Sequence, residues 1–280
     1  MSLRSLLVFL DGDARCDARS QLAARLAATH GSHLIGIAPT GALELSAGFL
    51  AASRHADDVA AARADAVRRA GQWVDRFVAC CRSQGAASIE AHVHEGEKAR
   101  VLVHHAHCAD LTVIGQADPA SPSHGEDKRF VEQVLLANAR PTLVVPHAGR
   151  FDGVGRNVLV AWDDSHGCAR AVADALPLLR TASAVHLRLW RRRDEVDEHA
   201  LHERMENVGR WLMRQGVSAG MRFAAIEGGV GDAILQEALD VGADLIVMGS
   251  YGHSGWTERL LGGATRTALA RSSVPLLMSH

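Results

Sequence analysis

The sequence lacks the features that mark membrane, secreted and nucleic-acid-binding proteins. Its formal net charge is only -2, so no strong field of one sign attracts nucleic acid or an anionic membrane. The apolar run at residues 5–10 (SLLVFL) is too short for a signal peptide or a membrane span, and no later run reaches that length. The five cysteines form no C-x-x-C pair and their number is odd, which favours reduced thiols. We therefore expect a soluble, cytoplasmic protein that binds neither nucleic acid nor membrane.

The first half of the chain alternates apolar runs with helical patterns. Short apolar runs predict strands at 5–11, 33–38, 88–96, 110–115 and 141–146, and segments with helical spacing predict helices at 17–29, 52–84, 97–108 and 128–139. An alternation of this kind implies a parallel sheet with helices on both faces. At 280 residues the chain is also long for one domain, so two domains are favoured.

The second half repeats the first. NVLVAWDDS (157–165) matches SLLVFLDGD (5–13), and GADLIVMGS (242–250) matches CADLTVIGQ (108–116), which aligns Asp163 with Asp11 and Gly249 with Gly115. The segment 148–156 has three glycines and no apolar run, as a linker has. The sequence thus predicts two tandem Rossmann-like α/β domains, at 1–147 and 157–280, each a five-stranded parallel sheet flanked by helices.

Two segments of the second repeat follow strands, where open parallel sheets bind ligands. Asp163 ends an apolar strand, so its carboxylate can accept hydrogen bonds from a ribose or an adenine amino group, cap the next helix, or hold the turn between them. Gly249 and Gly252 open a loop that ends at Gly262 and Gly263, directly before a helix. Glycines can bring backbone N–H groups against an anion, and a helix N-terminus favours one. The loop is either a phosphate cradle or a flexible surface turn.

The spacing Gly249-x2-Gly252-x9-Gly262-Gly263, together with ADLIVMGSYGHS and the closing SSVPLLMSH, resembles the nucleotide-binding signature of the universal stress protein (UspA-like) superfamily, G-x2-G-x9-G-(S/T). Both halves resemble domains of that family, whose fold is that of the adenine nucleotide alpha hydrolases. The resemblance implies that the second domain binds ATP or another adenine nucleotide, with Mg²⁺ as a candidate companion. It also implies pairing through the last strand of each domain, which here would give an internal pseudo-dimer, and it leaves a homodimer open.

By the same resemblance, Asp163 would contact ribose or adenine and Leu189 would line the base pocket. The residues that would surround the ribose and phosphates are Met248, Gly249, Ser250, Gly252, His253, Gly262, Gly263, Ala264 and Thr265.

Two departures from the signature bear on affinity. Gly263 stands where the family has Ser or Thr, and a lost neutral hydrogen bond weakens binding by about 0.5–1.5 kcal/mol. Thr265 is a candidate substitute for that hydroxyl. Trp256, a bulky residue within the loop, would either cover a ligand or fill its space.

The first repeat acts as an internal control. Asp118 replaces the second glycine, no Gly-Gly precedes the helix, and Asp118, Glu126 and Asp127 add negative charge where a polyphosphate would lie. We therefore expect nucleotide binding in the second domain, with a structural or regulatory role for the first.

The leading functional hypothesis is a nucleotide-binding stress-response protein that acts as a sensor or adaptor on protein partners. The alternative is a nucleotide-free scaffold that kept the fold and lost the pocket. An efficient enzyme is disfavoured, because the chain has no G-K-[ST] motif and no positioned general base, and WDDSHGCAR (162–170) is not the serine- and glycine-rich loop of an ATP pyrophosphatase. At most slow ATP hydrolysis is expected.

A metal site is a weaker hypothesis. His104, His107 and Cys108 have the i, i+3, i+4 spacing of a chelating helix face, near His92 and His94 on a predicted strand. Solvated histidines at a helix end explain the same pattern without a metal, and that interpretation is favoured.

Overall fold

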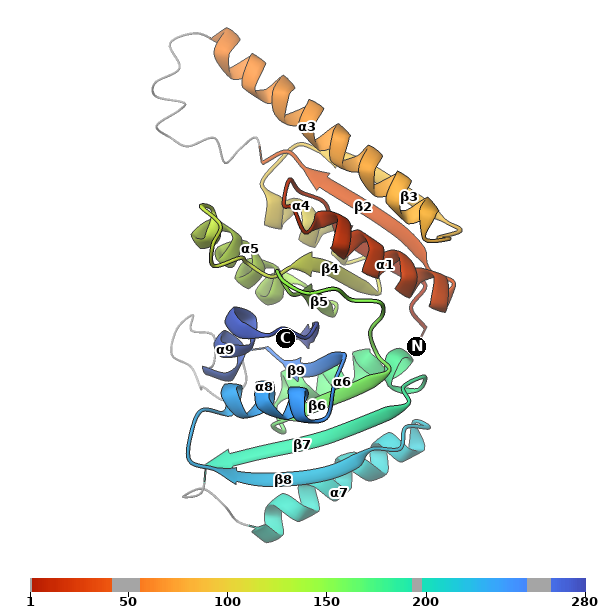
Figure 1. The fold of residues 1–280 in the computed structure, drawn as a ribbon, viewed down its shortest axis with the longest axis vertical. Coiled ribbons are helices and arrows are strands. Elements are labelled where there is room, and N and C mark those ends of the chain that lie inside the picture. The colour runs from red at the N-terminus through yellow and green to blue at the C-terminus, as the bar shows by residue number, and fades with distance from the viewer. Residues whose placement is uncertain (1, 42–55, 193–197, 251–262) are drawn as a thin grey trace.

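The two halves of the chain share one ten-stranded sheet. The computed structural model describes residues 2–41, 56–192, 198–250 and 263–280 (Figure 1). The strand order is β3-β2-β1-β4-β5-β10-β9-β6-β7-β8, so each half contributes five neighbouring strands in the same relative order. Within each half the strand pairs are parallel. The predicted fold class, two α/β units each with a five-stranded parallel sheet, is confirmed.

The elements follow the predicted order in both halves. The first half has β1 Ser5–Phe9, α1 Cys16–His30, β2 His33–Pro39, α3 Ala56–Ser83, β3 Ile89–His94, α4 Lys98–Ala106, β4 Leu111–Gly115, α5 His124–Ala137 and β5 Thr142–Val145. The second half has β6 Asn157–Trp162, α6 His166–Leu179, β7 Ala184–Arg192, α7 Glu198–Arg214, β8 Gly220–Ile226, α8 Val230–Asp240, β9 Leu245–Gly249, α9 Gly263–Arg271 and β10 Leu276–Ser279.

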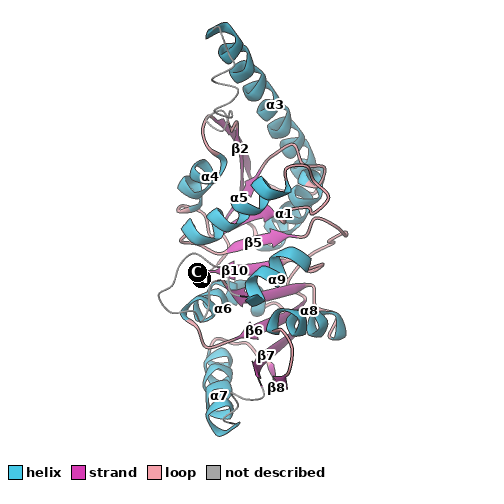
Figure 2. Cartoon of the chain, turned by 90° about the vertical axis from the view of Figure 1, so that its left-hand side faces the viewer, coloured by secondary structure: helices cyan, strands magenta, loops and turns pink. Residues whose placement is uncertain are grey.

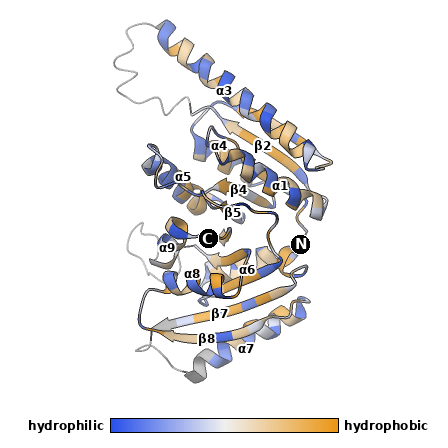
Figure 3. Cartoon of the chain, in the orientation of Figure 1, coloured by the Kyte–Doolittle hydropathy of each residue, from blue (hydrophilic) through white to orange (hydrophobic). Residues whose placement is uncertain are grey.

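Helices cover both faces of the sheet, as Figure 2 shows. Successive strand residues point to opposite faces, so Leu6 and Val8 join one buried cluster and Leu7 and Phe9 the other. The first cluster contains the buried side chains of α1, α3, α6 and α7, and the second those of α4, α5 and α8. The inner strands are mostly apolar in Figure 3 because both of their faces are covered.

The last strands of the two halves join the sheet. β5 and β10 pair antiparallel, with Leu143 opposite Leu277, so the chain pairs with itself in the way expected of an internal pseudo-dimer. Gln116, which follows β4, reinforces the junction. Its Nε2 donates to the carbonyl oxygen of Leu269 in α9 at 2.9 Å, and its Oε1 accepts from the backbone N–H of His147 at 3.0 Å. Pairing into a homodimer stays a prediction.

One predicted helix boundary differs. α5 begins at His124 rather than near 128, and two acidic residues in its first turn favour that start because they face the positive end of the helix dipole. The charged segment 191–204 is not one continuous helix. Instead β7 continues to Arg192, because β8 supplies a backbone partner as far as Ile226, and α7 begins at Glu198. No described helix combines the length and the apolar content needed to cross a membrane.

Candidate functional site

Asp163 holds the turn between β6 and α6. Its Oδ1 accepts from the backbone N–H of Ser165 at 3.0 Å, and the Ser165 hydroxyl oxygen accepts from the N–H of Cys168 at 3.1 Å, which caps α6. Asp164 between them has φ 64°, the left-handed conformation that a short polar residue tolerates in a tight turn. Of the open alternatives for Asp163, the turn is what the structure shows, and the cap is Ser165.

Gly249 is required by packing. A Cβ on Gly249 would lie 2.5 Å from the backbone nitrogen of Cys168 and 2.9 Å from the carbonyl carbon of Gly167. Conversely, a Cβ on Gly167 would lie 3.0 Å from the carbonyl oxygen of Ser250. The first turn of α6 therefore touches the end of β9 backbone to backbone. Packing alone therefore explains why residue 249 is glycine, whether or not a ligand binds nearby.

The neighbouring predicted residues are mostly buried. Leu189 has no exposed surface and packs in the core with α6 and α7, and Met248 is 4 % exposed on the opposite face. The Ser250 hydroxyl donates to the carbonyl oxygen of Ser279 at 3.0 Å, so it ties the end of β9 to β10. Register places Met248 opposite Ala161, so Asp163 and Ser250 follow adjacent strands at the same edge of the sheet.

The described part of the predicted loop resumes at α9. Gly263 is exposed, and a Cβ there would meet no atom of the described part of the chain within 4 Å. Ala264 is half-buried, and Thr265 is only 3 % exposed. The remaining predicted loop residues, Gly252, His253, Gly262 and the bulky Trp256, lie outside the described residues.

The equivalent position in the first half contains a buried ion pair that sequence reasoning missed. Arg19 of α1 is 1 % exposed, and its Nη2 lies 2.8 Å from Oδ1 of Asp11. Burial lowers the pKa of Arg19 and the nearby Asp11 carboxylate raises it, with the net shift upward, so the guanidinium stays charged. The sequence did contain an indication of this pair. Arg19 lies on the same helical face as the apolar Leu22 and Leu26, and the aligned residue of the second repeat is Ala171.

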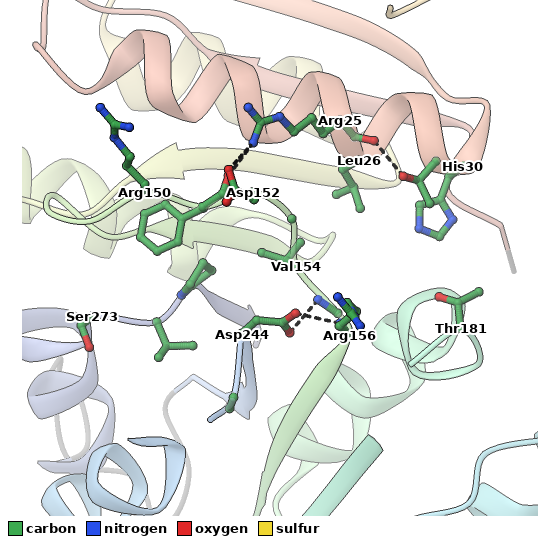
Figure 4. A pocket seen from close by; sticks show the side chains of 17 residues that line it. Arg25, Leu26, His30, Arg150, Asp152, Val154, Arg156, Thr181, Asp244 and Ser273 are labelled. Carbon is green, nitrogen blue, oxygen red and sulfur yellow. Dashed lines mark hydrogen bonds and ion pairs between the residues drawn. The ribbon is translucent and has the colours of Figure 1, made fainter. Parts of the chain in front are cut away.

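A cleft lies between the two halves at the amino ends of the strands, opposite the predicted site (Figure 4). Its volume is about 660 Å³, and α1, the linker and the residues before β9 and β10 line it. Arg25 of α1 pairs with Asp152 of the linker at 3.1 Å. Asp244 accepts from the N–H groups of Gly155 and Arg156, each at 2.9 Å. The Asp244 contacts hold the linker against the second half, and the exposed Arg25–Asp152 pair adds only a weak contact with the first.

The histidines gather differently from the predicted metal site. α4 ends at Ala106, so His107 and Cys108 lie beyond it and do not continue the helical face of His104. Instead His105 packs against His94, with ring centroids 4.3 Å apart. Across the described residues, no group of three or more His, Cys, Asp or Glu side chains is placed to hold a metal ion.

This histidine pair predicts a pH-dependent stability. Burial lowers the pKa of both His94 and His105, and the charges of neighbouring histidines lower them further, although Glu90 opposes this for His105. Because the folded pKa values lie below the unfolded value of about 6.5, the unfolded chain binds more protons, and stability falls as pH drops through this range.

As the pH falls from about 7.5 to 5, we expect the His105→Gln variant to lose less unfolding free energy than the wild type does. The substitution removes one histidine with a lowered pKa, and it also removes the charge repulsion between that histidine and His94. Urea denaturation across that range measures the slope. His202→Gln, at an exposed position in α7, is the control and keeps the wild-type slope. An unchanged slope in His105→Gln contradicts the prediction.

Residues 155–280 match the family model described as the Universal stress protein family. This half of the chain is therefore similar in sequence to universal stress protein domains. The match begins within the linker and contains β6 to β10, Asp163 and the glycine loop. No curated protein matches the chain.

Solved structures extend the likeness to both halves. A universal stress protein from Archaeoglobus fulgidus DSM 4304 is similar over 99% of this chain and 98% of its own, with a TM-score of 0.70 and 16% identity. A functionally unknown protein from Pseudomonas aeruginosa PAO1 (98% and 92% covered, TM-score 0.62, 17% identity) has a similar fold. A putative universal stress protein from Pseudomonas aeruginosa UCBPP-PA14 does too (98% and 92% covered, TM-score 0.61, 16% identity). The predicted UspA-like resemblance is supported by sequence for the second half, and the solved structures show a similar fold over both halves.

Proposed function

We propose that residues 157–280 form a domain that binds ATP or a related adenine nucleotide, and that the chain is a cytoplasmic stress-response sensor or adaptor. The first domain, residues 1–147, and the linker 148–156 carry no nucleotide in this proposal. The observation that carries it is the exposed amino end of α9 at Gly263, where a Cβ would meet no atom of the described residues within 4 Å. N–H groups in the first turn of a helix have no intrahelical acceptor, and they favour phosphate oxygens.

The other roles follow from position. Asp163 accepts a ribose or adenine hydrogen bond beside the turn it holds, Met248 lies next to the ribose, and Gly249 and Ser250 set the strand end from which the loop departs. Leu189 has no exposed surface, so it supports the site only from within the core. Gly252, His253, Gly262, Ala264 and Thr265 complete the predicted phosphate and ribose contacts. A Mg²⁺ ion bound to the phosphates would neutralise their charge. Hydrolysis is expected to be at most slow, because the sequence has no Walker lysine in a G-K-[ST] motif.

The test exploits the open position of Gly263. Gly263→Ser restores the hydroxyl of the family signature, and we expect ATP affinity to rise by about 0.5–1.5 kcal/mol, roughly two- to tenfold. Gly263→Asp introduces a carboxylate, which interacts favourably with the helix N-terminus but repels phosphate. ATP binding should therefore weaken while the stability of the protein is retained. Calorimetric titration of nucleotide-stripped protein with ATP, AMP and GTP measures both effects.

The matched control is Gly125→Ser. Gly125 lies in the first turn of α5, the equivalent helix of the first half, and a Cβ there also meets no atom within 4 Å. This variant should bind ATP as the wild type does. If folded wild-type protein and Gly263→Ser both bind no nucleotide, the proposal fails and the chain is a nucleotide-free scaffold.

A further inference from the structure

A separate cavity opens in the first half, at the carboxyl ends of β1 and β4. Its volume is about 420 Å³, within the range of roughly 300–1,000 Å³ typical of small-molecule sites. It lies where the second half has its predicted nucleotide site, but its chemistry is different. Its charged and aromatic lining residues are Phe9, Asp11, Asp13, Arg19, Lys98, Asp118, Asp127 and Phe130.

At the base of this cavity, one nitrogen of the Arg19 guanidinium has no acceptor among the described residues. Arg19 donates from Nε to the carbonyl oxygen of Phe9 at 3.1 Å and from Nη2 to Asp11 at 2.8 Å. Its Nη1 has no hydrogen-bond partner in the described part of the chain. Nη1 is close enough to Gly115 that a Cβ there would be 2.4 Å away, and both residues line the cavity. A guanidinium N–H group that lines a cavity without a protein acceptor can donate to a ligand oxygen, so this nitrogen marks a candidate position for one.

The rim of the cavity is acidic. Asp118 Oδ1 accepts from the N–H of Ala120 at 2.8 Å, and Asp127 Oδ2 accepts from the hydroxyl of Ser123 at 2.6 Å. Asp13 Oδ1 likewise accepts from a backbone N–H at 2.7 Å. The second oxygen of each carboxylate has no hydrogen-bond partner among the described residues.

The sum of these charges favours a cation. Arg19 neutralises Asp11, which leaves Asp13, Asp118 and Asp127 against the single ammonium of Lys98. Such a balance repels phosphate and attracts a protonated amine.

One wall is aromatic. The rings of Phe9 and Phe130 have centroids 4.3 Å apart and are tilted by 32°, and both residues line the cavity. An apolar wall beside carboxylates and a guanidinium suits a ring with an apolar C–H face and hydroxyl groups at its edge.

We propose that this cavity binds an amino sugar of hexosamine size. A ring or hydroxyl oxygen accepts from Nη1 of Arg19, the ammonium lies among the rim carboxylates, and the C–H face of the ring packs on Phe130. The site is independent of the proposed nucleotide site, since it lies in the other half of the chain and excludes phosphate.

Titration of the full chain with glucosamine, glucose and glucose 6-phosphate, followed by NMR, tests the proposal. We expect saturable binding of glucosamine, at least tenfold weaker binding of the neutral glucose, and no binding of glucose 6-phosphate in the first half. The double variant Asp118→Asn, Asp127→Asn retains an acceptor oxygen for each local hydrogen bond while removing both charges. It should bind glucosamine at least tenfold more weakly.

The control is Asp232→Asn, which removes a carboxylate that pairs with Arg271 in the second half and should leave glucosamine affinity unchanged. Arg19 is left intact because its ion pair supports the fold. Any of three results overturns the proposal: no saturable glucosamine binding to folded protein, equal affinity for glucose and glucosamine, or unchanged affinity in the double variant.

Discussion

The Asp244→Ala variant is expected to lose about 3 kcal/mol of unfolding free energy, because three backbone N–H groups lose a charged acceptor. Asp244 precedes β9, and its carboxylate accepts from the N–H groups of Gly155 and Arg156, each at 2.9 Å, and of Asn157 at 3.1 Å (Figure 4). It thereby fixes the linker at the point where the chain enters β6. Hydrogen bonds to charged groups are worth about 1.5–3 kcal/mol each, and part of this loss is recovered by water at the half-exposed site.

The first half repeats this contact, which supplies a matched variant. Asp110 accepts from the N–H of Arg4 at 2.7 Å and of Ser5 at 2.9 Å, directly before β4 and at the start of β1. Asp110→Ala should therefore be destabilised by a comparable amount. Asp152→Ala is the negative control, since Asp152 is fully exposed and its pair with Arg25 should contribute little.

Urea denaturation followed by circular dichroism measures these differences. If the halves unfold in separate transitions, Asp110→Ala shifts one and Asp244→Ala the other. A loss below about 1 kcal/mol in Asp244→Ala would mean that water replaces the carboxylate almost completely, and the contact would not be a main determinant of stability.

The contrast between Asp163 and Asp244 shows what could be predicted from the sequence. The strands and the repeat were predicted because they depend on local periodicity, and Leu6 and Val8 of the first predicted strand are fully buried. Asp244 belongs to a segment that was recognised as repeated, yet its role was missed. Its contacts join residues 87 to 89 positions apart, and no local pattern encodes them.

The same limit explains the missed features of the candidate site. The pairing of Arg19 with Asp11 depends on how α1 lies against the end of β1, and the packing of His105 on His94 depends on where α4 ends. Gly249 was chosen for its freedom to turn towards an anion. Its structural role became visible only with the first turn of α6 in place.

Gly249→Ala is expected to be destabilised by about 3 kcal/mol, at the upper end of the usual cost of overpacking, because the new methyl group meets backbone rather than a movable side chain. The Cβ would lie 2.5 Å from the nitrogen of Cys168 and 3.0 Å from its Cα, so β9 and α6 would have to separate. No change of side-chain rotamer can relieve this clash, because the neighbouring atoms belong to the backbone. The first turn of α6 would shift together with the turn that Asp163 holds.

Gly263→Ala is the matched control within the same signature. The exposed position has open space for a methyl group, and replacing glycine by alanine in a helix lowers the entropy of the unfolded chain, so a gain of about 0.4–1 kcal/mol is expected. Thermal and urea unfolding of the two variants measure the difference. Equal stability of Gly249→Ala and wild type would contradict the backbone contact. We thus predict that Gly249 is needed for packing and that Gly263 is not. This result would separate the structural role of the signature from its proposed role in nucleotide binding. It would leave Gly263 as the position where a change in nucleotide affinity can be measured without a change in fold.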